Sequence, residues 1–232
     1  AGIVRQGDGI RRRTGMGYFP FFMEIEGKHG VVVGGGKVAA RKVEKLLLFG
    51  PVLTVIAPVI DKSVRRQGEL LQKDAAPSLL FRERAVLMED LSGADFVIAA
   101  TDDAVQNGRI AAYCRTAGIP VNVVDDREKC TFFFPALIKD GSLTIGISTD
   151  GKSPAAASWT RQKIAEILPE GLGTVIDLMG QIRPAVMQME ADEAARKKLL
   201  TKLFLYGMEK EQNISEEEMM NFLQAALQKG HE

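Results

Sequence analysis

The feature that most constrains the fold is a short apolar segment that runs directly into glycines and then into a helical pattern. Val31-Val32-Val33 predicts a buried strand, which stops at Gly34-Gly35-Gly36. From Lys37 to Phe49 apolar residues return at helical spacing, and Gly50-Pro51 ends the pattern. A strand, a tight glycine turn and a helix in this order are typical of a dinucleotide-binding unit, provided that further strands follow.

Further strands do follow, and they alternate with helices. Because parallel neighbouring strands need a crossover connection, this alternation favours an α/β fold with a Rossmann-type parallel sheet. The predicted strands of this sheet are Val31–Val33, Val52–Ile56, Leu79–Arg82, Phe96–Ala100 and Val121–Val124, and the predicted helices around them are Lys37–Phe49 and Asp103–Ala117.

The rhythm changes after Asp125. A hairpin is predicted around Lys139-Asp140-Gly141-Ser142, with Phe132-Phe133-Phe134 and Leu143 to Ile147 as its arms and Pro135 as an edge or bulge. From Ser153 onward the pattern is helical, and Pro184 predicts a kink or a break in the second of these helices. The predicted C-terminal helices are Ala155–Leu168, Thr174–Met189, Ala191–Tyr206 and a last one from Ser215 to about Gln228.

Charge and composition exclude some classes of protein. The 30 Lys and Arg residues balance the 30 Asp and Glu residues, so net charge gives no argument for nucleic acid as the main partner. No apolar run reaches the roughly 18 residues of a membrane span. Two cysteines, Cys114 and Cys130, cannot build a disulfide framework in 232 residues, which predicts a reducing, cytoplasmic location. Residues 1–15 are interpreted as a disordered tail, with a basic targeting arm as the alternative.

The glycine segment has the spacing Gly34-x-Gly36-x-x-Ala39. Gly34 allows the tight turn, Gly36 lets the backbone approach a pyrophosphate, and Ala39 lets the helix pack closely on the strand. The helix N-terminus supplies free N–H groups and the positive end of a dipole for the phosphates. The alternative is a glycine-rich turn in an α/β domain that binds nothing.

The acid that usually follows the second strand, and that binds the adenine ribose, is missing. Ile56 is followed by Ala57-Pro58-Val59, and Asp61 comes late. Beyond it, Lys62, Arg65 and Arg66 either face a 2′-phosphate or form a solvated helix face. The residues therefore do not separate NAD from NADP.

Polar side chains also follow the later strands. Thr101-Asp102-Asp103 comes after the fourth strand, while Asn122 and Asp125 lie on or after the fifth. Ligands of a doubly wound sheet bind outside the carboxyl ends of its strands, so all of these residues are candidates. Asp102 or Asp103 alternatively caps the next helix. The carboxylate of Asp125 is placed to take a proton as a hydride leaves.

These residues together resemble a known family, the siroheme-synthase dehydrogenase module (precorrin-2 dehydrogenase, in some members also sirohydrochlorin ferrochelatase). The resemblance covers roughly residues 16 to 190. The motifs that carry it, in order, are Phe19-Pro20-Phe21-Phe22, Val32-Val33-Gly34-Gly35-Gly36-Lys37-Val38-Ala39-Ala40-Arg41-Lys42, Ala99-Ala100-Thr101-Asp102-Asp103, Asn122-Val123-Val124-Asp125 and Ser148-Thr149-Asp150-Gly151-Lys152-Ser153-Pro154.

The resemblance implies NAD-dependent oxidation of precorrin-2, a tetrapyrrole, to sirohydrochlorin by a homodimer, and it leaves open whether ferrous iron is then inserted. It implies an NAD-binding Rossmann domain over residues 16–134, a dimerisation region over 135–168 and a helical domain over 169–232. Asp125 matches the family's catalytic aspartate. Cofactor contacts are expected at Gly34, Gly35, Gly36, Lys37, Val38, Ala39, Thr101, Asp102 and Asn122.

The substrate carries many carboxylates, so its pocket requires cations and hydrogen-bond donors. The substrate-binding residues expected from the resemblance are Ser148, Thr149, Lys152, Ser153 and Arg161. Arg127, Lys129, Lys163 and Arg183 are further candidate cations, each alternatively an ordinary surface charge. Thr149 and Asp150 depart from the family's usual Ser-Ser-Gly-Gly-x-Ser-Pro segment.

No metal site is predicted, because His29 and His231 are isolated in the sequence. Two other functions stay open at this point. One is a non-catalytic module that senses NAD(P) and acts on a partner, which would not require Asp125. The other is a bare assembly domain, which would not bind NAD at all.

Overall fold

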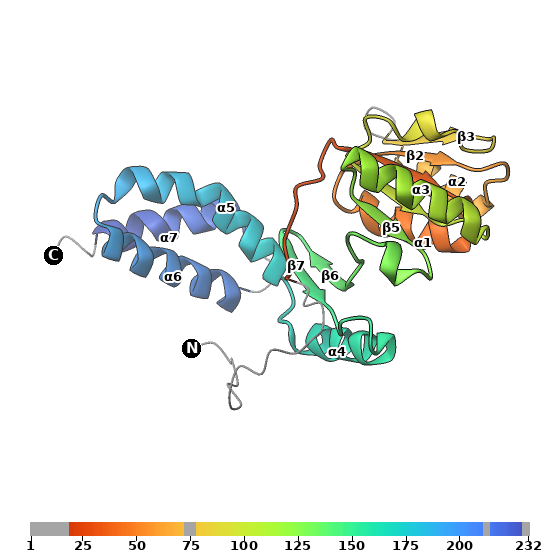
Figure 1. The fold of residues 1–232 in the computed structure, drawn as a ribbon. Helices are drawn as coiled ribbons and strands as arrows, with labels where there is room; N and C mark the ends of the chain where they lie inside the picture. The colour runs from red at the N-terminus through yellow and green to blue at the C-terminus, as the bar shows by residue number, and fades with distance from the viewer. Residues whose placement is uncertain (1–18, 72–77, 211–213, 229–232) are drawn as a thin grey trace. The chain divides into compact units, whose positions relative to one another are not determined.

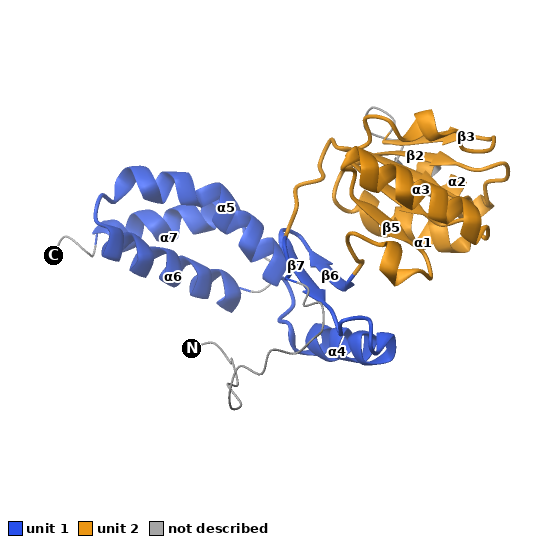
Figure 2. Ribbon diagram, in the orientation of Figure 1, with its two compact units in different colours: residues 1–21, 135–232 blue, residues 22–134 orange. Residues whose placement is uncertain are grey.

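The structure is a computed structural model that describes residues 19–71, 78–210 and 214–228. The predicted tail over residues 1–15 lies outside the described residues. The chain divides into two compact units, one formed by Phe22–Phe134 and the other by Ala1–Phe21 with Pro135–Glu232 (Figure 2). No helix of the described residues is both long enough and apolar enough to cross a bilayer.

The unit of residues 22–134 is built on a parallel sheet of five strands (Figure 1). The strands are β1 (His29–Val33), β2 (Val52–Ile56), β3 (Leu79–Arg82), β4 (Phe96–Ala99) and β5 (Val121–Val123), in the spatial order β3-β2-β1-β4-β5. The order reverses between β1 and β4, and such a switch point is where doubly wound sheets bind ligands. The predicted Rossmann-type fold is confirmed.

Helices cover both faces of this sheet. α1 (Lys37–Leu47) and α2 (Lys62–Leu71) pack on one face, and α3 (Ala104–Ala117) packs on the other (Figure 1). Two short 3-10 turns, η1 (Met88–Leu91) and η2 (Arg127–Lys129), complete the unit.

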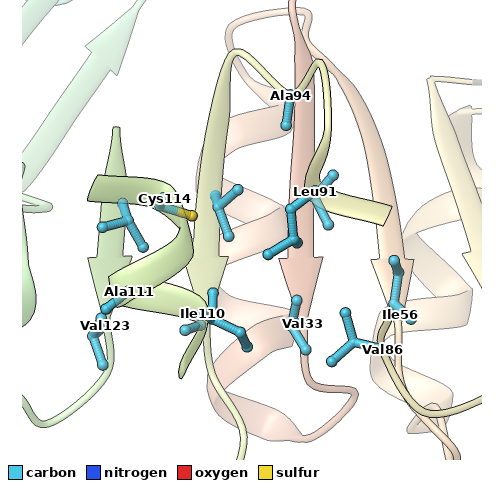
Figure 3. Packing of buried hydrophobic residues seen from close by; sticks show 13 residues of the cluster. Val33, Ile56, Val86, Leu91, Ala94, Ile110, Ala111, Cys114 and Val123 are labelled. Atoms are coloured by element: carbon cyan, nitrogen blue, oxygen red, sulfur yellow. The ribbon is translucent and has the colours of Figure 1, made fainter. Parts of the chain in front are cut away.

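Side chains of each strand alternate between two cores, because successive residues of a strand point to opposite faces. Val32 packs with α1, whereas Val31 and Val33 pack with α3. In the second core Cys114 is fully buried beside Ile110 (Figure 3), which confirms its predicted place in the core. Burial in this core raises the pKa of the Cys114 thiol to about 11.

The other unit begins with a two-stranded antiparallel sheet, β6 (Ala136–Asp140) and β7 (Leu143–Ile147), joined by the predicted Asp-Gly turn. The first predicted arm was wrong, since Phe132, Phe133 and Phe134 form no strand. The strand starts only after Pro135, because a proline has no N–H to donate to a ladder.

Four helices follow, namely α4 (Pro154–Ile167), α5 (Leu172–Met189), α6 (Glu193–Glu209) and α7 (Glu216–Gln228). α5, α6 and α7 share one core around Val175, Leu203 and Met219. Pro184 does not break α5, which continues to Met189. Pro184 gives no N–H to the carbonyl of Gly180, four residues earlier, and the helix continues without that one hydrogen bond.

Candidate dinucleotide site and catalytic carboxylate

In the glycine loop between β1 and α1, the first two glycines are tightly surrounded by backbone atoms and the third is not. A Cβ added at Gly34 would lie 2.2 Å from the carbonyl oxygen of Ala100, and φ there is +123°. A Cβ added at Gly35 would lie 2.2 Å from the carbonyl oxygen of Val59. A Cβ added at Gly36 would meet no atom within 4 Å. The first two glycines therefore fit the loop to its neighbours, and Gly36 faces free space.

That free space lies at the N-terminus of α1. Gly36 is the N-cap residue in extended conformation and contributes no side-chain cap to the helix. The first turn holds no acidic side chain, so its N–H groups and the dipole of the helix stay available for an anion. Ala39 is fully buried against the sheet, as its place in the motif predicts. The arrangement fits a dinucleotide pyrophosphate.

The loop after β4 is held by a side chain that the sequence analysis did not single out. The hydroxyl of Thr101 donates to Asn107 Oδ1 at 2.7 Å, and Asn107 Nδ2 donates back to the carbonyl oxygen of Thr101 at 3.0 Å. Asn107 is 5% exposed and lies in the second turn of α3. Because Asn107 fixes the backbone of Thr101, it shapes the edge where the switch point lies.

The two aspartates of this loop differ. Asp103 caps α3, since its carboxylate accepts from the N–H groups of Val105 and Gln106. That is the alternative the sequence left open for it. Asp102 is exposed and precedes the cap, and its predicted contact with a cofactor stays a prediction.

Asp125 follows β5 in an unusual conformation. Its φ is +60°, a region that costs a residue with a Cβ about 1–2 kcal/mol. The side chain is exposed, and among the described residues its carboxylate has no hydrogen bond or ion pair. The neighbouring Asp126 is instead paired with Lys129, and this bond lowers the pKa of the Asp126 carboxyl. Backbone strain of this kind is typical of functional positions.

Beneath this strand end lies a polar cluster that joins α1 to β5. Lys42 Nζ donates to Asn122 Oδ1 at 2.8 Å and sits 3.8 Å from the centre of the Phe134 ring. Asn122 Nδ2 donates to the carbonyl oxygen of Phe132 at 3.0 Å and approaches Cys130 Sγ at 3.6 Å. Burial lowers the pKa of Lys42 to about 8. Asn122 thus makes its hydrogen bonds within the protein, and its predicted contact with a cofactor stays a prediction.

The end of β2 carries no acid, as the sequence indicated, but Asp61 comes close to the glycine loop. Its N–H donates to the carbonyl oxygen of Gly35 at 2.8 Å. Its carboxylate accepts from both the N–H and the hydroxyl of Ser63, and these bonds lower the pKa of Asp61. Lys37 is one of the cations whose charge acts on it, which places this carboxylate beside the start of α1.

The predicted substrate residues belong to the other unit, in the loop between β7 and α4. Ser153 caps α4 through the N–H of Ala156, and Thr149 Oγ1 donates to the carbonyl oxygen of Ser153 at 2.9 Å. Asp150 has φ of +58° and lies 3.3 Å from Lys152 Nζ. The other two predicted residues of this set are Ser148, whose hydroxyl accepts from the N–H of Asp150, and Arg161 on α4.

The remaining candidate cations lie on separate elements. Arg127 is in η2 beside the Phe133 ring, Lys163 pairs with Glu166 on α4, and Arg183 is on α5. In the part of the chain that the structure describes, no three His, Cys, Asp or Glu residues are grouped to hold a metal ion.

Comparison with known proteins supplies the family. A family model described as "Putative NAD(P)-binding" matches residues 21–136, and one described as "Sirohaem biosynthesis protein central" matches residues 140–167. The chain belongs to the siroheme-synthase module family. A siroheme synthase of Photorhabdus laumondii is 39% identical over 173 residues, which are 75% of this chain and 36% of that protein. One of Hydrogenovibrio crunogenus is 36% identical over 199 residues, 82% of this chain and 40% of that protein.

This chain therefore spans well under half the length of these curated relatives. A solved structure titled "SirC, precorrin-2 dehydrogenase" superposes with a TM-score of 0.64 at 21% identity, covering 90% of this chain and all of that one. That likeness confirms the fold, and the matched family confirms that the unit of residues 22–134 is of the NAD(P)-binding class.

Proposed function

We propose that this chain oxidises precorrin-2 to sirohydrochlorin with NAD as the oxidant, as a step of siroheme biosynthesis. The observation that carries the proposal is Asp125, an exposed carboxylate that makes no hydrogen bond or ion pair among the described residues and is held in left-handed conformation at the carboxyl end of β5. β5 pairs with β4, which borders the switch point. The carboxylate therefore lies at the edge of the sheet where doubly wound folds bind their ligands, and this position supports its assignment as the proton acceptor.

The reaction removes a hydride and a proton from the macrocycle. A bound nicotinamide supplies the hydride acceptor, so the protein has to hold the cofactor and accept the proton. The open space at Gly36 and the N-terminus of α1 would hold the pyrophosphate. An oxygen of the Asp125 carboxylate takes the proton and later passes it to water. Asn107 keeps Thr101 and its loop in place beside the cofactor.

Anaerobic turnover of precorrin-2 with NAD tests the proposal, with NADH and sirohydrochlorin both followed by absorbance. Asp125→Asn should lower kcat by a factor of about 100 or more, because a positioned base contributes roughly that much, and should leave NAD binding unchanged. Asp126→Asn is the matched control, since that carboxylate is already paired with Lys129. Unchanged turnover in Asp125→Asn would remove the catalytic assignment. Absence of any turnover in a folded, NAD-binding protein would favour the sensor hypothesis.

Ferrous iron is a second substrate to test in the same assay. Iron insertion displaces two pyrrole protons and uses the nitrogens of the macrocycle as ligands, so the protein needs a proton acceptor rather than a metal cluster. We assign that role to Asp125 as well. Iron insertion that is faster than the protein-free reaction and is lost in Asp125→Asn would show a bifunctional enzyme. A rate equal to the protein-free reaction would show a dehydrogenase alone.

We also propose a homodimer formed through the region of residues 135–168. The sheet of β6 and β7 has only two strands, and such a hairpin is marginal without further packing. On α4, Trp159 is 62% exposed and Ile167 is 78% exposed, so this helix offers apolar surface to a partner chain. Trp159→Glu should shift the molar mass measured by light scattering from dimer to monomer. An unchanged mass would place the interface elsewhere.

We also propose a cytoplasmic location for the protein, in agreement with the free thiols of Cys114 and Cys130.

A further inference from the structure

The helical part of the chain contains a groove that the reaction chemistry described above does not use. It lies between α5 and α6 and has a volume of about 650 Å³. Three of its apolar side chains, Met179, Leu200 and Phe204, also pack against the core that these helices share with α7. Its walls come from one face of each helix, at the spacing Ile176, Met179, Arg183, Met187 on α5 and Glu193, Lys197, Leu200, Phe204 on α6. All of these residues belong to the unit that contains residues 135–232.

The groove combines apolar side chains, called its floor below, with cationic side chains, called its rim. Ile176, Met179, Leu200 and Phe204 are each partly exposed in it rather than buried. The rim carries Arg183, Arg196 and Lys197, opposed by the single carboxylate of Glu193. The lining therefore offers both apolar surface and positive charge to a bound ligand.

The cations of the rim are available to a ligand. Among the described residues, the side chains of Arg183 and Lys197 make no hydrogen bond or ion pair. Arg196 Nη1 donates to the backbone carbonyl oxygens of Glu190 and Ala191, at 3.2 and 2.7 Å, which fixes its guanidinium at the mouth of the groove. A guanidinium held in this way binds a carboxylate with less loss of side-chain entropy.

We infer that this groove binds a flat macrocycle with several carboxylates, the chemistry shared by the substrate and the product of the proposed reaction. The inference rests on the proposed function for the identity of that macrocycle. The volume lies within the range of small-molecule sites, about 300–1,000 Å³. An apolar floor covers the ring, and three cations pair with its acid side chains. A short acidic peptide satisfies the rim but leaves the floor without an apolar partner, so the macrocycle fits better.

Uroporphyrin, a stable and fluorescent octacarboxylate porphyrin, is the probe for a titration of the full chain. Arg183→Gln with Lys197→Gln should weaken its binding about tenfold or more, because two charge-assisted contacts are lost. The matched control is Lys198→Gln with Lys202→Gln, which removes the same charge from exposed positions of α6 that do not line the groove. It should change the affinity less than about twofold. All of the changed side chains except Arg183 lie on α6 and none is buried, so folding is preserved.

Thr201→Glu gives an independent test, since it adds a negative charge at the wall of the groove without removing a contact of the core. It should weaken uroporphyrin binding, and added salt should reduce the difference from the unchanged protein. Equal losses in the groove and control variants, or no loss in either groove variant, would overturn the site. Displacement of uroporphyrin by an acidic peptide at equal concentration would also overturn it.

Turnover assays distinguish whether the groove binds the substrate or the product of the reaction. A groove that captures substrate predicts a raised KM for precorrin-2 in the Arg183→Gln, Lys197→Gln protein, whereas a groove that retains product predicts weaker inhibition by sirohydrochlorin with KM unchanged. Asp125→Asn should bind uroporphyrin as the unchanged protein does. In the unchanged protein, uroporphyrin binding without turnover of precorrin-2 would therefore refute only the proposed function, and turnover without uroporphyrin binding would refute only the groove.

Discussion

Replacing Gly36 with alanine separates cofactor binding from folding. The added Cβ meets no protein atom within 4 Å, and the backbone there, with φ of −87° and ψ of −175°, is one that any residue adopts. The added methyl group reduces the freedom of the unfolded chain, which stabilises the protein, but alanine is a poorer N-cap residue than glycine, which destabilises it. The two effects offset each other, so the free energy of unfolding should change by less than about 1 kcal/mol.

The same methyl group lies where the pyrophosphate would approach the start of α1. Displacing the phosphates costs one or more charge-assisted hydrogen bonds to backbone N–H groups, each worth about 1.5–3 kcal/mol. Gly36→Ala should therefore bind NAD roughly 10- to 100-fold more weakly. Calorimetric titration measures the affinity, and thermal unfolding without NAD measures the stability.

Two other glycine variants serve as controls. Gly34→Ala places a Cβ 2.2 Å from Ala100 O at φ of +123°, and should destabilise the protein by about 2 kcal/mol or more. Gly93→Ala has positive φ, +75°, but no clash, and should cost only about 1 kcal/mol. If Gly36→Ala keeps full affinity for NAD, the pyrophosphate does not bind at the start of α1. If it unfolds like Gly34→Ala, the open space assigned to Gly36 is wrong.

Three further variants test the parts around the site. Asn107→Ala should cost about 2–4 kcal/mol of unfolding free energy and weaken NAD binding, because the hydrogen bonds to Thr101 are lost, and denaturant titration with NAD calorimetry measures both. Lys42→Met should remove a rise in stability between about pH 8 and pH 10.5, since in the native protein Lys42 gives up its proton at a lower pH than in the unfolded chain. A rise that persists in Lys42→Met would assign it to another group. Arg84 holds the pKa of Asp90 well below its usual range, so Asp90→Asn should destabilise the protein at pH 7 and destabilise it less near pH 2, as urea midpoints at the two pH values would show.

Local pattern was enough to predict most of the sheet. Each strand from β1 to β5 is a short, mainly apolar run. Such runs are typical of the strands of a parallel sheet whose two faces are covered by helices. The hairpin was predicted correctly from its Asp-Gly turn. Its first arm was predicted too early in the chain, because the apolar Phe132, Phe133 and Phe134 suggested a strand that in fact begins only after Pro135. A proline that lacks a donor decides where a ladder can start, and apolar content does not.

The sequence by itself determined the features that depend only on residues close together in the chain. These are the strand, the glycines and the helix of the dinucleotide site, the cap at Asp103 and the position of Asp125 after β5. The tertiary structure decided which side chains meet across long separations. Lys42 reaches Asn122, 80 positions later, only because α1 packs on the face of the sheet that β5 completes. Asn107 and the groove of α5 and α6 were likewise invisible, since a hydrogen-bond partner or a cavity depends on how elements pack, and no local periodicity records that.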